Sequence, residues 1–360
     1  MPKVQATDAM RRLGLTLPVV QGPFGGGLST AQLTATVANL GGLGSYGAHH
    51  LPADRIGRVA DEIRALTSGP FALNLWVSDH DAGGLQLSHE DFERAWRVFE
   101  PYFRELGVDK PEPPRRYHPA FDEQFEALLE ARPPVFSFVF GVPSARILSE
   151  CRRREIATLG AATSIAEALA LEAAGVDAIV ATGFEAGGHR PSFLASAEES
   201  LMGTFALIQL IADRVKIPVI AAGGIADARG VHAALRLGAQ AAQIGTAFLA
   251  CEESGTTDAH RAMLLSDRAQ HTALTRAFSG RLARGVRNRW TEEMAPRLND
   301  VAPFPVQGWF VSQLRPAAIA AERTDLVSLW SGQIAPNLRH RSATALMQAL
   351  RDELSISTNL

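Results

Sequence analysis

One imidazole stands directly after a glycine turn in the middle of the chain. Residues 178–190 run from an apolar, strand-like stretch into Glu-Ala-Gly-Gly, and His189 follows the two glycines. In a repeating β/α chain, catalytic groups are usually placed in the loop after a strand. A neutral imidazole there can accept a proton near physiological pH. We therefore predict that His189 is a catalytic or substrate-binding residue, the alternative being that it only orients its loop.

Two further glycine turns close the apolar runs that follow. Gly223 and Gly224 end one run shortly before Asp227, where a helix should begin, and Gly245 and Thr246 end the next. Glycines let backbone N–H groups approach an anion, and a helix N-terminus adds partial positive charge. Such turns after the last two strands of a β/α barrel commonly bind phosphate. We predict a phosphate site here, although any tight turn needs small residues, and the phosphate could belong to a flavin, a sugar or a nucleotide.

Two other segments have the composition of a cofactor site. Three consecutive glycines in residues 21–27 would leave room for a flat ring beside Phe24, unless the segment is only a flexible turn before a helix. Asn74 stands inside an apolar run, where an amide is costly unless it hydrogen-bonds the backbone or a ligand. We predict that both segments contact the cofactor.

Eight short apolar runs predict the strands that position these groups. Most lack polar alternation, which indicates burial on both faces. They cover residues 17–21, 42–46, 71–77, 135–140, 155–161, 178–181, 218–222 and 241–244. Helical patterns lie between them at residues 30–40, 53–66, 121–131, 164–174, 202–214 and 228–237. This repeat favours an α/β fold, a closed TIM (β/α)₈ barrel, over an open doubly wound sheet.

Two segments interrupt the repeat. Residues 78–116 are polar and proline-containing, with a helix expected at 89–106, and residues 253–305 are arginine-rich and expected to be mostly helical. Insertions at this end of a barrel commonly form a lid. We predict a barrel made of residues 1–252 and 306–360, with an insertion at about 78–116, and a substrate-binding lid at 253–305. We expect both segments to cover the active site.

Three arginines in the predicted lid are spaced three residues apart. On a helix Arg281, Arg284 and Arg287 would share one face. We expect a solvated or salt-bridged face rather than a nucleic-acid patch, because the net charge of the chain is -3.

Composition indicates an ordinary globular protein of 360 residues, with 46% hydrophobic and 20% charged residues. Nothing in the charge favours nucleic acid or a membrane surface as a partner. Cys151 and Cys251 are too few for a disulfide framework and lack metal-ligand spacing, so we expect buried thiols and no metal site. No apolar run approaches the ~20 residues of a membrane-spanning helix. The first residues lack the pattern of a secretory signal, and we expect a cytoplasmic enzyme.

Jointly, these motifs resemble the nitronate monooxygenase family, formerly called 2-nitropropane dioxygenases. The matching stretches are residues 18–27, 71–75, 184–190, 219–227, 243–248, 275–281 and 329–333. The resemblance runs from about residue 17 to residue 333 and is weakest at 78–132. It implies an oxidoreductase, a flavoprotein whose TIM barrel binds FMN without a covalent bond.

The resemblance also implies roles for residues. His189 would be the active-site base or would orient the substrate. The phosphate would lie at Gly224, Gly245 and Thr246. The full set of implied cofactor residues is Gly22, Pro23, Phe24, Asn74, Thr182, Gly187, Gly188, Gly223, Gly224, Gln243, Ile244, Gly245 and Thr246. Two positions depart from the family pattern, because Thr182 stands where glutamine is frequent and Phe24 stands where methionine is common.

The implied reaction is the oxidation of an alkyl nitronate, or of a nitroalkane after proton abstraction, with O₂ to a carbonyl compound and nitrite. An NAD(P)H-dependent FMN enzyme, such as an enoyl-thioester or quinone reductase, is the nearest alternative, because a similar glycine–histidine turn would serve it. An FMN-dependent hydroxyacid oxidase matches only loosely, and neither cysteine suits a dehydrogenase that needs a nucleophilic thiol. A non-catalytic flavin-binding module is the alternative from another class, and the sequence allows a homodimer.

Overall fold

The computed structural model describes residues 7–85 and 87–356. The first six residues, which contribute to the expectation that no secretory signal is present, lie outside the described residues. Among the described residues, no helix is long and apolar enough to cross a bilayer.

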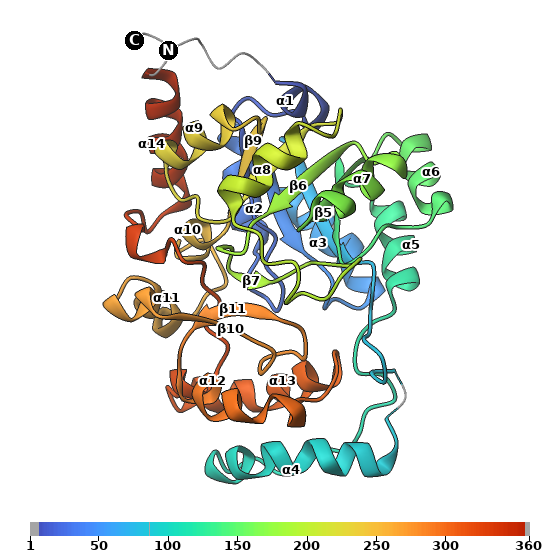
Figure 1. The fold of residues 1–360 in the computed structure, drawn as a ribbon, viewed down its shortest axis with the longest axis vertical. Coiled ribbons are helices and arrows are strands. Elements are labelled where there is room, and N and C mark those ends of the chain that lie inside the picture. Colours follow the sequence, from blue (N-terminus) through green and yellow to red (C-terminus); the bar gives the residue numbers. More distant parts are fainter. Residues whose placement is uncertain (1–6, 86, 357–360) are drawn as a thin grey trace.

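Eight parallel strands form a closed barrel (Figure 1). They are β1 (Val19–Gln21), β2 (Gly44–Gly47), β3 (Phe71–Trp76), β4 (Val135–Val139), β5 (Ala157–Ala162), β6 (Ala178–Thr182), β8 (Val219–Ala222) and β9 (Ala241–Ile244). The order around the sheet is β1-β9-β8-β6-β5-β4-β3-β2, and a parallel bridge between Val20 and Leu43 joins its two edges. The predicted TIM barrel is confirmed and the open sheet is excluded, since an open sheet would leave both edges unpaired.

Helices cover the outside of the barrel. They are α2 (Ala31–Asn39), α3 (Ala53–Arg64), α5 (Phe121–Ala131), α6 (Ala145–Arg153), α7 (Ile165–Ala173), α8 (Thr204–Ala212), α9 (Ala228–Arg236) and α14 (Ala343–Ile356). A further helix, α1 (Asp8–Leu13), packs against the interior residues of the barrel instead. Side-chain caps start several of them: Thr30 accepts from Leu33 N, and Asp227 accepts from Gly230 N. Each cap satisfies a backbone donor that has no partner inside its helix.

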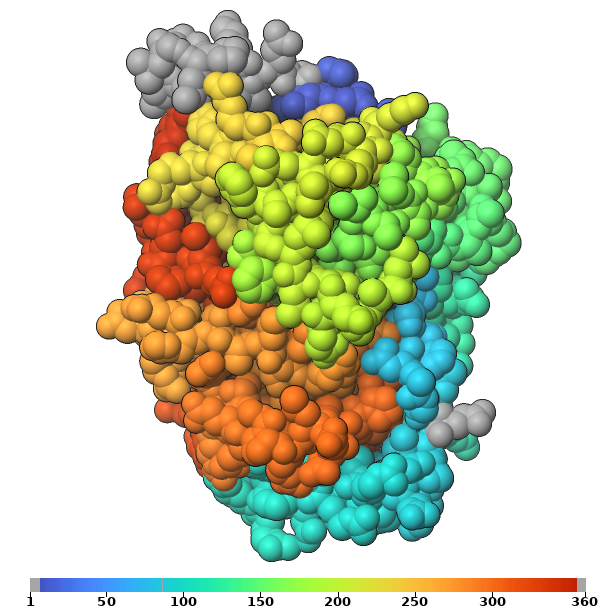
Figure 2. Space-filling view, in the orientation of Figure 1, coloured from blue at the N-terminus to red at the C-terminus, as the bar shows by residue number. Residues whose placement is uncertain are grey.

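The residues that cover the barrel mouth form a separate layer, which we call the lid: helix α4 (His89–Glu105) and residues 267–327. In Figure 1 the lid helices lie together at the end of the molecule opposite the chain termini. Residues 267–327 contain η1 (Asp267–Gln270), β10 (Thr272–Thr275), β11 (Ala283–Val286), α12 (Arg289–Met294), η2 (Ala295–Asp300), α13 (Val306–Ala320) and η3 (Thr324–Leu326). Figure 2 shows the orange residues of the lid packed against the barrel on the face in view, with the cyan residues of α4 on the far side of the orange layer.

An aromatic core holds the lid together. The rings of Phe99 on α4 and Phe310 on α13 stack with centroids 4.7 Å apart, and Phe99 also stacks on Trp290 of α12 at 5.3 Å. Helix α13 therefore belongs to the lid, which corrects the prediction that residues from 306 onward belong to the barrel. The remaining helices outside the barrel repeat are α10 (Thr246–Leu249), α11 (Asp258–Leu264) and η4 (Ala335–Asn337).

The predicted helical character of residues 253–305 is wrong in part, because β10 and β11 form an antiparallel hairpin there. A third strand, β7 (Gly188–His189), pairs with β11, with His189 opposite Ala283. The three arginines consequently share no helix face. Arg281 and Arg284 are buried, with 6% and 4% exposure, because Asp81 and main-chain oxygens accept from their guanidinium groups. Only Arg287 is exposed as expected.

Candidate active site

A cavity of about 590 Å³ lies between the carboxyl ends of the barrel strands and the lid. His189 and all but one of the predicted cofactor residues line it, although they come from different strand ends along the chain. Those lining residues are Gly22, Pro23, Phe24, Asn74, Thr182, Gly187, Gly188, Gly223, Gly224, Gln243, Gly245 and Thr246. The exception is Ile244, whose fully buried side chain packs in the core between barrel and helices. Successive side chains of a strand point to opposite faces, so Gln243 faces the cavity and Ile244 does not.

The two predicted phosphate turns border open space. A Cβ atom on Gly224 would come no closer than 3.7 Å to another group, the Cβ of Glu185, and one on Gly245 would lie 3.9 Å from the Phe24 ring. At Gly187, by contrast, a Cβ atom would lie only 2.5 Å from Gly332 N. Gly224 and Gly245 thus leave room for a ligand beside their backbones, whereas Gly187 is required by chain packing.

Glu185, which belongs to the glycine motif but received no role from the sequence, fixes the shape of these turns. Its carboxylate accepts hydrogen bonds from Thr204 N at 2.9 Å and from Thr204 Oγ1 at 2.7 Å. Its main-chain oxygen accepts from Gln333 N at 3.0 Å. Thr246 Oγ1 accepts from Gly332 N at 2.9 Å on the other side of the turn. These bonds hold the glycine turns in place before any ligand arrives, so little ordering cost is left for binding.

Asn74 is buried and lines the cavity, and its amide nitrogen donates to Ser137 Oγ at 3.0 Å. The two residues are direct neighbours in the register of β3 and β4. This bond leaves the amide oxygen of Asn74 available as an acceptor at the cavity wall. Ser137 was not predicted from the sequence, although a hydroxyl in an otherwise apolar run is the same signal that identified Asn74.

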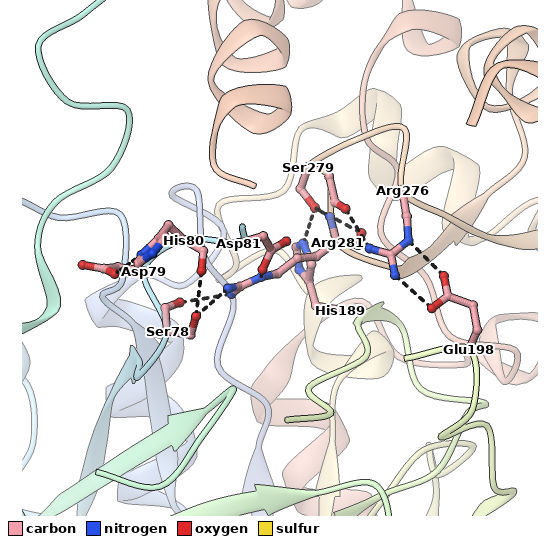
Figure 3. A network of polar contacts seen from close by, with 10 residues as sticks. Ser78, Asp79, His80, Asp81, His189, Glu198, Arg276, Ser279 and Arg281 are labelled. Carbon is pink, nitrogen blue, oxygen red and sulfur yellow. Dashed lines mark hydrogen bonds and ion pairs between the residues drawn. The ribbon is translucent and has the colours of Figure 1, made fainter. Parts of the chain in front are cut away.

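His189 is held in the cavity wall by a hydrogen bond of 2.7 Å between its Nε2 and Ser279 Oγ (Figure 3). Ser279 Oγ also accepts from Arg281 N at 3.3 Å. Burial, together with the positive charge of Arg281 and the neighbouring His50, lowers the pKa of His189 to about 3. The imidazole is therefore neutral at physiological pH, with a lone pair on one of its two ring nitrogens.

Aromatic rings account for the apolar surroundings of His189. The Trp76 ring meets its imidazole edge-on with centroids 4.8 Å apart, and Trp330 lies at 5.2 Å. These rings exclude water and stabilise the uncharged form of the base.

Two more histidines after the end of β2, neither of them predicted from the sequence, also line the cavity. His49 stacks on Trp76 with ring centroids 4.0 Å apart, and His50 adjoins it at the same distance. Burial lowers the pKa of His49 well below its usual range. The pKa of His50 is also lowered, by partial desolvation in the cavity and by the neighbouring His118 and Arg315, although the residue is exposed. Both are neutral at physiological pH, so they contribute shape and polarity without charge. Their position directly after a strand, as for His189, was the signal that could have revealed them.

Arg315 of α13 also lines the cavity. Its Nη1 donates to Gly26 O at 3.0 Å, and burial lowers its pKa from a very high ordinary value, which leaves it charged. Because Gly26 O is an uncharged partner, the guanidinium can still attract an anion in the cavity. No sequence signal marked Arg315, because only the packing of α13 in the lid brings it to the barrel mouth.

A second hydrogen-bond network joins the lid to the barrel loops (Figure 3). Arg276 binds the carboxylate of Glu198 through two hydrogen bonds of 2.9 Å and donates to Gly280 O at 3.0 Å. The loop that carries Ser279 is thereby attached to the segment after β7.

A family model and individual relatives both match this chain over most of its length. A protein-family model described as "Nitronate monooxygenase" matches residues 8–353. A nitronate monooxygenase of Paraburkholderia phytofirmans is 41% identical over 349 residues, which cover 96% of this chain and 94% of that protein. A probable nitronate monooxygenase of Staphylococcus aureus is 38% identical, with 89% of each chain covered.

Two solved structures are also similar. A nitroalkane oxidase from Streptomyces ansochromogenes superposes with a TM-score of 0.88 at 34% identity, covering 98% of this chain and 99% of that chain. A mutant form of FabK from Thermotoga maritima superposes with a TM-score of 0.73 at 25% identity, covering 98% of this chain and 97% of that chain.

Proposed function

The chain belongs to the nitronate monooxygenase family, and we propose that it is an FMN-dependent enzyme that oxidises alkyl nitronates with O₂ to a carbonyl compound and nitrite. Enzymes of this family are oxidoreductases that depend on a flavin. The observation that carries the proposal is a neutral, half-buried His189 held beside a cavity whose opposite turns leave space for a phosphate.

The residues present fit FMN. Backbone N–H groups around Gly224, Gly245 and Thr246 would bind the phosphate, because these turns precede helices and no side chain fills the space beside the two glycines. Asn74, Gly22 and the neighbouring cavity residues would surround the ring system. When bound, the flavin supplies the electron acceptor that O₂ reoxidises, while the protein supplies orientation and charge.

Two side chains support the choice of substrate. A nitronate is an anion, and Arg315 places a positive charge on the cavity wall. A neutral nitroalkane must first lose its α-proton, and His189 is an uncharged imidazole able to accept it. Ser279, bonded to Nε2, would fix which ring nitrogen faces the substrate.

The visible spectrum of the purified protein tests this proposal. It should show a bound flavin that is bleached or otherwise reduced by anaerobic addition of a nitronate and that recovers when O₂ is admitted, with nitrite released. A protein with no flavin spectrum even after reconstitution with FMN would contradict the cofactor assignment.

An NAD(P)H-dependent reductase is the second candidate, because the FabK structure covers nearly the whole chain at a lower TM-score. Flavin reduction by NADPH and not by nitronate would favour it. Flavin binding with no reduction by either donor would indicate a binding module. The cytoplasmic location and the homodimer stay predictions.

A further inference from the structure

Arg281 lies behind the cavity wall, at the junction of three of its parts. Its guanidinium is positioned between two phenylalanine rings, with centroids 4.1 Å away for Phe140 and 4.2 Å for Phe304. Phe140 follows β4, and Phe304 belongs to the lid. The ring of Trp76, at the end of β3, lies 5.5 Å away. All three rings line the cavity, so one buried cation supports three faces of it.

The same guanidinium is hydrogen-bonded to the segment that leaves β3. Nε donates to Asp81 Oδ1 at 2.9 Å, Nη1 donates to Ser78 O at 3.1 Å, and Nη2 donates to Ser78 Oγ at 3.0 Å (Figure 3). Asp81 N in turn donates to Phe304 O at 2.8 Å. These bonds connect residues about 200 positions apart in sequence and attach the lid to the barrel beside the cavity.

The backbone of Arg281 is also connected to the histidine. Ser279 Oγ accepts from Arg281 N, donates to Arg281 O at 3.3 Å, and is hydrogen-bonded to His189 Nε2. A displacement of Arg281 would therefore move the hydroxyl that orients the imidazole.

We propose that Arg281 is the positioning residue for His189: it holds the Ser279 loop against the imidazole and keeps a fixed positive charge beside it. Arg281 does not itself line the cavity, so it acts through Ser279 and through the field of its charge. The proposal rests on the function proposed for His189, because a neutral imidazole is useful to a base but not to a residue that only shapes a loop.

The groups around His189 determine how far the charge of Arg281 shifts its pKa. Arg281 is the positive group from the lid, and His50 faces His189 from the loop after β2; both lower the pKa of His189 in addition to burial. Asp81 faces Arg281 and partly offsets its charge. His49 lies on the same wall and is neutral. Because Arg281 carries a full positive charge near His189, its replacement by an uncharged residue should let the pKa of His189 rise.

The expected shift follows from the spacing. The centre of the Trp76 ring lies 5.5 Å from the guanidinium of Arg281 and 4.8 Å from the centre of the imidazole, so these two groups are at most about 10 Å apart. At an effective dielectric constant of about 20, one unit charge within that distance changes a pKa by at least roughly one unit.

The experiment compares R281M and D81N in the purified holoenzyme. The titration of His189 is followed by NMR in protein with isotope-labelled histidine, and its signal is assigned with H189N. The pH dependence of kcat/KM is measured with a neutral nitroalkane. R281M should raise the pKa of His189 and move the acid limb of kcat/KM to higher pH, whereas D81N should lower the pKa of His189 in the NMR titration.

Two further variants separate charge from geometry. R281K keeps the charge but cannot reproduce the forked bonds to Ser78 and Asp81, so it should lower kcat for the neutral nitroalkane without raising the pKa. R284M removes an arginine that is equally buried but bonds Phe184 O and Thr272 Oγ1 instead, and it should leave the pKa of His189 unchanged.

Shifts of the same sign in R281M and D81N, or no upward shift in R281M, would overturn the proposal. If R281M does not fold, the other two variants decide. The proposal is then overturned if D81N does not lower the pKa of His189 in the NMR titration and R281K leaves kcat unchanged. The NMR titration does not depend on turnover. If R281M raises and D81N lowers the pKa of His189 in a protein that does not oxidise nitronates, the proposed function is contradicted but the role of Arg281 is supported.

Discussion

Gly245→Ala is the sharpest test of the phosphate site, because the structure allows the methyl group without strain. Gly245 has φ -103° and ψ -78°, outside the left-handed region that favours glycine. The new Cβ would lie 3.9 Å from the Phe24 ring, which is an ordinary contact. The substitution should therefore change the free energy of unfolding of the apo-protein by no more than about 0.5 kcal/mol.

The same methyl group would occupy the space in which a phosphate must approach the backbone. A backbone N–H bond to a charged oxygen contributes about 1.5–3 kcal/mol. Loss of one such bond corresponds to FMN binding about 10- to 150-fold weaker. We expect that loss in a fluorescence titration of the apo-protein with FMN, alongside an unchanged Tm of the apo-protein.

Two other glycines provide matched controls. Gly57→Ala, in the middle of α3 with no atom within 4 Å of the new Cβ, should stabilise the protein by about 0.5–1 kcal/mol and leave FMN affinity unchanged. Gly187→Ala would place a Cβ 2.5 Å from Gly332 N and should destabilise the fold by about 1–3 kcal/mol. Wild-type FMN affinity in Gly245→Ala would refute the phosphate assignment at this turn.

Three further predictions concern the site. His189→Ala should retain FMN and slow turnover of neutral nitroalkanes more than that of preformed nitronates; equal relative losses in steady-state assays would exclude the role as a base. Arg315→Gln should raise KM for a nitronate by about tenfold with a smaller effect on kcat, since the charge attracts the anion in ground and transition states alike; an unchanged KM would exclude that contact. The pKa of the buried His49 in the folded protein lies well below the ordinary 6.5. The unfolded chain therefore binds more protons as pH falls below 6.5, and the free energy of unfolding should decrease by at most about 1.4 kcal/mol per pH unit for this histidine until its folded pKa is reached. Chemical denaturation of wild type and His49→Asn across pH 4–7 measures this, and equal pH slopes would contradict it.

The barrel could be predicted because its signals are local. Continuous apolar runs such as residues 219–222 are typical of strands covered on both faces, and glycine turns directly follow β8 and β9. The cavity residues at these strand ends were found for the same reason. Ile244 was the exception, and strand alternation alone could have excluded it, since its neighbour Gln243 faces the cavity.

The lid could not be predicted in the same way. The three-residue spacing of Arg281, Arg284 and Arg287 matched a helix, but two of these cations are buried on or beside a strand because their partners lie elsewhere in the chain. Asp81, which pairs with Arg281, lies 200 positions away, and no local pattern encodes that contact. The tertiary ion pair overrides the local spacing because a buried cation must have partners.

The barrel and the lid contribute different parts of the cavity. Strand ends and glycine turns supply the predicted cofactor contacts, and they are the parts that the sequence could identify. Arg315, Ser279 and Phe304, which lie in the lid, supply a charge, the partner of the base and an apolar wall. Differences in substrate among proteins with this barrel should therefore follow the lid more closely than the strands. An exchange of residues 267–327 with those of a relative that prefers another substrate should transfer that preference while leaving FMN affinity within about threefold, because lid substitutions remove no backbone donor from the phosphate turns.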